Sequence, residues 1–243
     1  KANDKTERDK TTFVFVTPRR WPGKNEWVMD RKAQGQWKDI RAYDASDLEQ
    51  WLEQSIAGQA WFANETLHPS NGVRSLDKSW SDWAGVASPP LAGALFAPAI
   101  DVAKRTMVSR LSKPPEEPTV IAADSTEEAL AFLAQLFGEA GGELTVHRDR
   151  VLVFDEPGVL PKLGHGAQNF IAVATTREVE RELAPFARSM HTIVVYPRNA
   201  ANADPHVVLE PLNYEAFRTS LEGMKYSRDD IDKFSNESGR SLT

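Results

Sequence analysis

Five short apolar runs, separated by segments with helical spacing, constrain the fold of this chain more than any other feature. The runs occupy residues 119–123, 150–154, 170–174, 192–196 and 207–209. Strands that are apolar on both faces and alternate with helices are typical of a parallel sheet covered on both sides. We therefore predict an α/β fold, with a further short strand at 143–147.

Helix signals separate these runs. Ser125 and Glu128 match a capping box, in which a hydroxyl and a carboxylate accept hydrogen bonds from free amides of the first helical turn. Residues 130–137 supply the apolar face of that helix, and a second helix is expected over 178–188. Two further helices are expected near the end of the sequence, the second of them after a cap at Ser227.

The first third of the chain differs in composition from the rest. All seven tryptophans of the 243 residues lie within residues 1–83. Residues 1–87 carry 13 basic and 13 acidic side chains, so the whole net charge of −6 belongs to the remainder. Such asymmetry indicates separate modules. We predict a Trp-rich module over 1–87, a Pro-rich linker with a helix over 88–118, an α/β module over 119–212 and a helical segment over 213–243.

The Trp-rich module has the pattern strand, basic loop, helix, strand, helix. Residues 11–17 form a β-branched and aromatic run, and residues 37–43 are a second strand candidate. A further helix begins at Asp44 and Asp47, whose carboxylates can accept its first free amides. A module of this length is too short to bury a complete core alone.

Residues 13–21, 37–44 and 47–53 together resemble a segment of large bacterial proteins. Those proteins join a restriction-endonuclease-like (PD-(D/E)xK) domain to a STAND-type P-loop ATPase-like region, and they are associated with mobile elements and antiphage defence. The resemblance implies a cytoplasmic, multidomain parent that cleaves DNA with Mg²⁺ held by two carboxylates and a lysine. It also implies that residues 119–212 are a degenerate P-loop-like module, followed by the start of a helical lid.

We do not expect a complete nuclease site in this chain. The hairpin that carries the acidic residues of such nucleases precedes the strand at 13–17, and this sequence lacks it. Lys1 is either the active-site lysine at the tail of that hairpin or part of a charged terminus. The charged start and the end after Gly239 suggest a fragment that spans the junction of two domains. Its expected partners are DNA, other domains of the parent and further copies in an oligomer.

A basic loop after the first strand is the candidate DNA contact. Arg19, Arg20 and Lys24 surround Trp21, and Trp27 follows. Such a loop can contact phosphates through its cations while an aromatic ring packs or stacks. The alternative is a solvated basic turn that its tryptophans pin to the domain. The negative net charge restricts any DNA footprint to this local surface.

The apolar run that ends in Asp155 and Glu156 resembles the Walker B element of P-loop ATPases, in which the aspartate binds Mg²⁺ and the glutamate orients water. The alternative is a buried strand that ends in an acidic loop. No G-x-x-x-x-G-K-[ST] phosphate loop occurs in the sequence. Where that loop would lie, residues 122–128 contain no glycine or lysine but three carboxylates, which repel a triphosphate. We predict that the module does not hydrolyse ATP.

Residue types and spacing exclude several other kinds of site. The chain has no cysteine, its five histidines lack metal-ligand spacing, and no G-x-S-x-G motif occurs. No apolar run of about 18 residues is available to span a membrane. The sequence favours a DNA-associated module that is not catalytic by itself. A non-catalytic protein-interaction scaffold and a nucleotide-binding switch are the alternatives.

Overall fold

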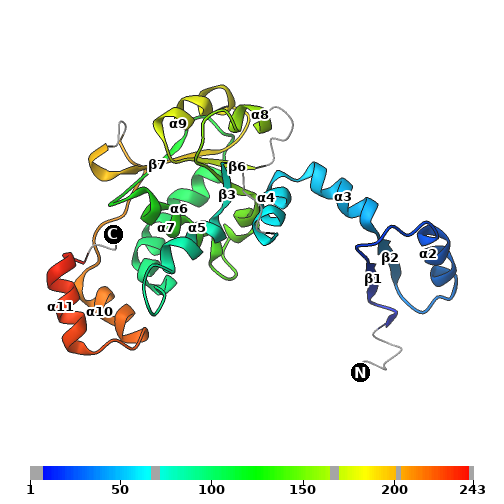
Figure 1. The fold of residues 1–243 in the computed structure, drawn as a ribbon, viewed down its shortest axis with the longest axis horizontal. Helices are drawn as coiled ribbons and strands as arrows, with labels where there is room; N and C mark the ends of the chain where they lie inside the picture. The colour runs from blue at the N-terminus through cyan, green and yellow to red at the C-terminus, as the bar shows by residue number, and fades with distance from the viewer. Residues whose placement is uncertain (1–7, 67–71, 165–169, 201–203, 241–243) are drawn as a thin grey trace. The chain divides into compact units, whose positions relative to one another are not determined.

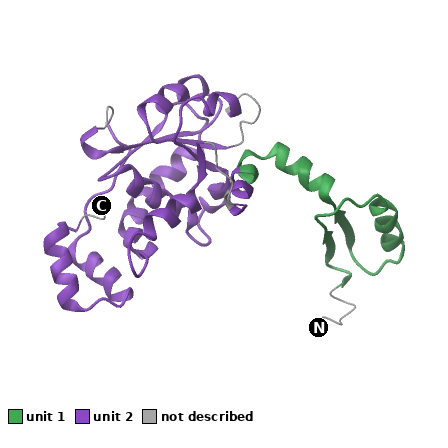
Figure 2. Ribbon diagram, viewed as in Figure 1, with its two compact units in different colours: residues 1–59 green, residues 60–243 purple. Residues whose placement is uncertain are grey.

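The computed structural model describes residues 8–66, 72–164, 170–200 and 204–240 (Figure 1). The chain forms two compact units, residues 1–59 and residues 60–243 (Figure 2). Unit 1 contains a two-stranded parallel sheet, and unit 2 contains a six-stranded, mostly parallel sheet. Helices accompany both sheets, so the predicted α/β class is confirmed.

Unit 1 consists of two parallel strands joined by a crossover helix. Strand β1 (Thr12–Val16) pairs with β2 (Asp39–Tyr43), and α2 (Lys24–Ala33) connects them. Helix α3 (Ala45–Gln54) follows directly, and α4 (Ile56–Glu65) runs across the boundary between the units. The predicted order of elements in this part of the chain is therefore confirmed.

The start of α3 forms as its sequence predicts. The Asp47 N–H donates to Asp44 Oδ1 at 3.4 Å, and the Asp44 N–H donates to Asp47 Oδ2 at 2.8 Å, which completes a capping box. Burial in unit 1 is nevertheless slight. Among its described residues, only Ile40 and Asp44 are buried. Two strands and two helices of this size enclose almost no core, as the length of the module suggests.

The sheet of unit 2 has the order β3-β5-β6-β7-β4-β8. All its pairs are parallel except β3 with β5. The strands are β3 (Val73–Ser75), β4 (Thr119–Ala123), β5 (Val151–Phe154), β6 (Ile171–Ala174), β7 (Thr192–Pro197) and β8 (Val207–Val208). The chain thus leaves β4 for the far side of the sheet, returns through β6 and β7, and ends beside β4 again.

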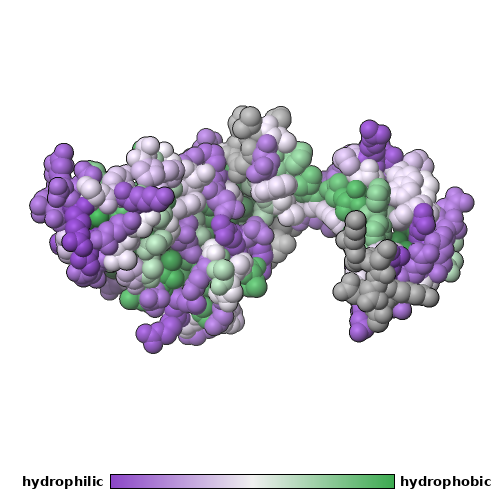
Figure 3. All heavy atoms as spheres, turned by 90° about the horizontal axis from the view of Figure 1, so that it is seen from below, coloured by the Kyte–Doolittle hydropathy of each residue, from purple (hydrophilic) through white to green (hydrophobic). Residues whose placement is uncertain are grey.

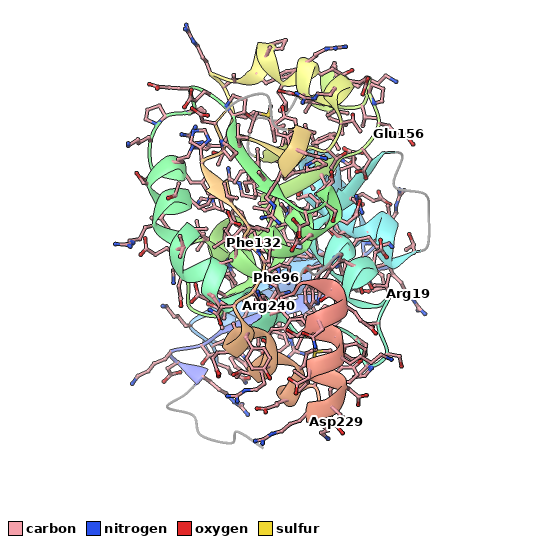
Figure 4. All side chains as sticks on the ribbon, turned by 90° about the vertical axis from the view of Figure 1, so that its left-hand side faces the viewer. Arg19, Phe96, Phe132, Glu156, Asp229 and Arg240 are labelled. Atoms are coloured by element: carbon pink, nitrogen blue, oxygen red, sulfur yellow. The ribbon has the colours of Figure 1, made fainter. Side chains whose placement is uncertain are left out.

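Helices cover both faces of this sheet (Figure 1). One face carries α5 (Leu76–Ala84), α6 (Ala97–Leu111) and α7 (Thr126–Gly138), whose apolar side chains form one core with alternate residues of the central strands. The other face carries α8 (Leu160–Gly164) and α9 (Arg177–Leu183). Inside the first core, the rings of Phe96 and Phe132 lie edge to face, 5.9 Å apart (Figure 4).

Two helices follow the sheet, as predicted. Helix α10 (Tyr214–Gly223) packs against α11 (Arg228–Ser238), and Leu95 joins them in a small apolar cluster. Ser227 caps α11, since its hydroxyl accepts a hydrogen bond from the Asp230 N–H at 3.2 Å. Gly239 ends α11 in the left-handed conformation, with φ of 59°. Arg240, which follows with φ of 66°, has its carbonyl bonded to the Leu212 N–H.

Unit 2 begins earlier than the sequence predicted. The predicted Trp-rich module extends to residue 87, but β3 and α5 belong to the large sheet and its core. The predicted linker over 88–118 contains a short 3₁₀ helix, η1 (Gly93–Phe96), and α6, which packs on α7. These segments are part of the fold of unit 2 because their apolar side chains complete its core.

Two local predictions are wrong. Residues 143–147 do not form a strand but lead into a 3₁₀ helix, η2 (Thr145–Arg150). β3 and β6 already pair with both edges of β5, so no edge of that strand is left for a further one. The helix expected over 178–188 ends at Leu183 and continues as a 3₁₀ turn, η3 (Ala184–Phe186), because Pro185 lacks the N–H that an α-helix needs. A last 3₁₀ turn, η4 (Arg198–Ala200), follows β7.

Candidate nucleic-acid interface

The basic loop of unit 1 connects β1 to α2, and its central cation is held inside it. Lys24 Nζ lies 3.0 Å from Asp44 Oδ1 and also contacts Asp47 Oδ2. The hydrogen bond to Asp47, and then the one to Asp44, raises the pKa of Lys24 above its ordinary value. The Lys24 side chain therefore joins the start of α2 to the start of α3, and its charge is already matched. Contrary to the expectation from the sequence, Lys24 holds the loop together and is not a free cation for a DNA phosphate.

Asp44 fixes the conformation of this loop. Its carboxylate accepts the backbone N–H of Trp21 at 2.9 Å as well as the Lys24 ammonium. The hydrogen bond from Trp21, followed by the one from Lys24, holds the pKa of Asp44 far below its usual range. The carboxylate therefore stays ionised at neutral pH and keeps the loop attached to α3.

Arg19 and Arg20 are the accessible cations of the loop. The Arg19 N–H donates to Thr17 Oγ1, and its carbonyl accepts the Ala45 N–H, both at 3.3 Å, while its side chain is exposed. Arg20 lies 3.3 Å from Glu49, and the two side chains are 75% and 59% exposed. Exposed pairs of this kind contribute little and are screened by salt. Both guanidinium groups can therefore reach an incoming phosphate.

Aromatic side chains back the loop. The ring of Trp21 lies 5.2 Å from that of Trp27, and Phe15 contacts both at 5.7 and 5.8 Å. The Arg31 guanidinium stacks over Trp27 at 5.6 Å. Trp21 is thus packed against neighbouring rings and partly buried. This arrangement agrees with the alternative in which the tryptophans pin the loop to the domain.

The acidic pair after β5 does not have the surroundings of a metal site. Asp155 Oδ1 accepts hydrogen bonds from Arg74 Nη2 and from Thr175 Oγ1, both at 3.1 Å. Glu156 is exposed at the surface (Figure 4). In the sheet, β6 and β7 lie between β5 and β4. The surroundings of both residues agree with the alternative, a buried strand that ends in an acidic loop, better than with a Walker B element.

The position of a phosphate loop, between β4 and α7, is filled by side chains of the protein. The N–H of Asp124 donates to Glu128 Oε2 at 2.8 Å, and the Ser125 hydroxyl caps α7 by accepting the Glu128 N–H at 3.1 Å. Arg198 pairs with Asp124 and reaches Glu210 at 2.9 Å. The carboxyl ends of the neighbouring strands β4 and β7 lie side by side here. From β4 the chain continues to β5 on one side of the sheet, and from β7 it continues to β8 on the other. Open α/β sheets bind ligands at such a point, but this one is closed by an ion-pair network.

Arg74 and Arg198 are the residues that sequence reasoning missed. Arg74 lies between Asp155 and Glu127, donates from Nη2 to each carboxylate at 3.1 Å, and so links β3 to β5 and α7. Arg198 follows β7 and neutralises the carboxylate after β4. Neither arginine lies near its partners in the sequence. A surplus of carboxylates after successive strands was the one available signal that cations would be needed there.

The described residues do not fit the Mg²⁺ site that the resemblance implies. No group of three histidine, aspartate or glutamate side chains in the described ranges is arranged to hold a metal ion. In unit 1, Asp39, Asp44 and Asp47 each pair with a lysine or arginine. Lys1, the candidate catalytic lysine, lies outside the described residues. No catalytic step can be derived from these side chains.

Comparisons with protein-family models, with curated proteins and with solved structures gave no match. The family resemblance thus rests on the sequence segments alone. None of the helices in the part of the chain that the structure describes is long and apolar enough to cross a membrane.

Proposed function

We propose that this chain is a DNA-associated, non-catalytic part of a bacterial nuclease/STAND-type protein of the antiphage or mobile-element kind. In this proposal, unit 1 contacts DNA phosphates through Arg19 and Arg20. Unit 2 is a degenerate P-loop-like module that no longer binds nucleotide and serves as a scaffold or relay. The parent protein is cytoplasmic and supplies the metal and the catalytic residues.

The proposed DNA contact rests on the different roles of the cations in the basic loop. Lys24 and Asp44 hold its backbone, whereas Arg19 and Arg20 extend from the carboxyl end of β1 with their charges accessible. The N-terminus of α2 lies in the same loop, and no side chain caps it. A helix N-terminus favours an anion. Two arginines on a preorganised loop suit a local phosphate contact that does not depend on the net charge of the chain.

The test is binding of a fluorescent duplex, followed by anisotropy at two salt concentrations. We expect the double variant R19A/R20A to weaken binding and to reduce the salt slope by about 2, because each arginine bound to a phosphate adds about 1 to that slope. The matched control is K10A/K38A, which removes the same charge from exposed residues that precede β1 and β2. Equally weakened binding in both variants, or no binding by the unaltered chain, would show that the loop does not bind DNA.

A different observation favours the alternative function, a protein-interaction scaffold. Strand β1 leaves Val14, Phe15 and Val16 between 41% and 54% exposed. A parallel sheet is normally covered on both faces. This surface therefore suits a protein partner, and it is independent of the arginines in the loop.

A further inference from the structure

Strand β1 has a free edge. Within the described residues, β2 is its single neighbour in the sheet. The Thr17 N–H donates to the Tyr43 carbonyl at 3.0 Å, and the Thr11 carbonyl accepts the Lys38 N–H at 3.1 Å. The odd-numbered residues of β1 thus direct their backbone groups to β2. Because these directions alternate along a strand, the N–H and C=O groups of the even-numbered residues point to the free edge.

This edge is apolar and uncharged. Val14 is 49% exposed and Val16 is 54% exposed, and apolar side chains reach the surface of unit 1 (Figure 3). Proteins usually protect an exposed edge with charges, prolines or bulges, because it otherwise pairs with another chain. Strand β2 carries Asp39 and Arg41, whereas β1 carries no charge. The geometry therefore selects β1 as the edge that takes a further strand.

We propose that β1 pairs antiparallel with β1 of a second copy, about a two-fold axis at Val14. The sequence of β1 is nearly the same in both directions from that residue. Phenylalanines stand on either side of Val14, and the β-branched Thr12 and Val16 follow them. A two-fold interface requires such self-complementarity, since each residue meets its counterpart on the partner.

The backbone directions agree with this register. Val14 would exchange both hydrogen bonds with the partner's Val14, and Thr12 would do so with the partner's Val16, because these are the residues whose polar groups face the free edge. Phe13 would then stand opposite the partner's Phe15 in the closer, non-hydrogen-bonded type of pair. Aromatic and β-branched pairs across strands stabilise a sheet. This pairing does not depend on DNA contact by the loop.

Sedimentation velocity of the whole chain, from about 2 µM to about 200 µM, tests the dimer. The variant V14K places two ammonium groups opposite each other at the axis, and we expect it to raise the dimer dissociation constant about tenfold or more. The control M29K changes a residue of α2 that is 70% exposed in the same unit, and it should dimerise as the unaltered chain does. A chain that stays monomeric over this range overturns the proposal, as does a dimer that V14K leaves intact.

Cysteine cross-linking tests the register, because the chain has no cysteine of its own. Hydrogen-bonded antiparallel pairs place their Cα atoms about 5.5 Å apart, within the range of a disulfide. We expect V14C alone to form a disulfide dimer, and T12C to cross-link with V16C only when the two variants are mixed. Efficient cross-linking of V16C with itself would indicate parallel pairing and overturn the proposal. V14C that cross-links no faster than M29C would do the same.

Discussion

Glu128 gives the sharpest prediction, because it is a carboxyl group buried at the end of the segment where a phosphate loop would lie. Its side chain is at the start of α7, and the residue is 5% exposed. Its Oε2 accepts a hydrogen bond from the Asp124 N–H at 2.8 Å, and a backbone hydrogen bond with Ser125 also acts on the carboxyl group. Burial raises the pKa of Glu128 from 4.5 to about 7. The folded protein therefore favours the neutral acid over the carboxylate.

The sign and size of the effect on stability follow from this difference. A carboxyl group whose pKa is higher in the folded chain contributes stability below the unfolded pKa, and this contribution is lost as the pH rises through the folded value. Each tenfold difference in proton affinity corresponds to about 1.4 kcal/mol. With values of 4.5 and about 7, ionisation of Glu128 costs about 3 kcal/mol at pH 8. About 2.5 kcal/mol of this cost develops between pH 5 and pH 8.

The perturbation is E128Q, which keeps an oxygen for the Asp124 N–H but removes the titration. We expect the free energy of unfolding of the unaltered chain to fall by about 2.5 kcal/mol relative to E128Q between pH 5 and pH 8. Urea denaturation followed by circular dichroism measures both. The control E178Q changes an exposed glutamate in the first turn of α9 and should follow the unaltered chain.

A pH profile of E128Q that runs parallel to that of the unaltered chain would refute this reasoning. It would mean that Glu128 is hydrated or paired in the folded protein. The start of α7 would then be open to water, and the view that protein side chains close the phosphate-loop position would fail with it.

Three further predictions concern other parts of the chain. F132A should lower the free energy of unfolding of unit 2 by about 3–5 kcal/mol in urea denaturation, since the ring is fully buried against Phe96; a decrease under about 1 kcal/mol would contradict the packing. Lys32, and then Arg41, lowers the pKa of Asp39 to about 2, so its stabilising contribution should be present above pH 3.8 and lost as the pH falls through 2. An NMR titration should find this pKa moved towards 3.8 in R41A. Magnesium with ATP at millimolar concentration should shift the melting temperature by less than about 1 °C, and a shift of several degrees would revive the nucleotide-binding switch.

Local signals predicted much of the fold because they depend on neighbouring residues. The capping residues Asp44, Ser125 and Ser227 begin helices where the sequence places them. The five apolar runs form strands because their periodicity leaves them no polar face. These features belong to short segments, so they can be recognised without knowledge of distant partners.

Features that depend on distant partners were not predictable in this way. Strand β3 has three residues, and it exists only because β5 offers an edge almost eighty positions later. Because β3 belongs to the large sheet, the boundary between the units lies at residues 59 and 60 and not at residue 87 as predicted. The same is true of the candidate sites. Arg74 reaches Glu127 and Arg198 reaches Asp124 across 53 and 74 residues. Lys24 looked like part of a DNA surface because its partner Asp44 lies beyond α2.

The two proposals combine in a way that can be tested. Arg19 follows Val14 by five residues, of which those after Val16 lie in the loop, and an extended chain advances about 3.3 Å per residue. A dimer about Val14 therefore places the two Arg19 residues at most about 33 Å apart. One turn of B-DNA is about 34 Å long, so two loops within that distance can both reach phosphates of the same duplex. V14K adds a positive charge, which by itself would tighten DNA binding. If the dimer is the binding form, V14K should instead weaken binding to a duplex of about 20 base pairs, while M29K should not. Tighter binding by V14K would show that DNA binding does not require the dimer, and neither proposal would then support the other.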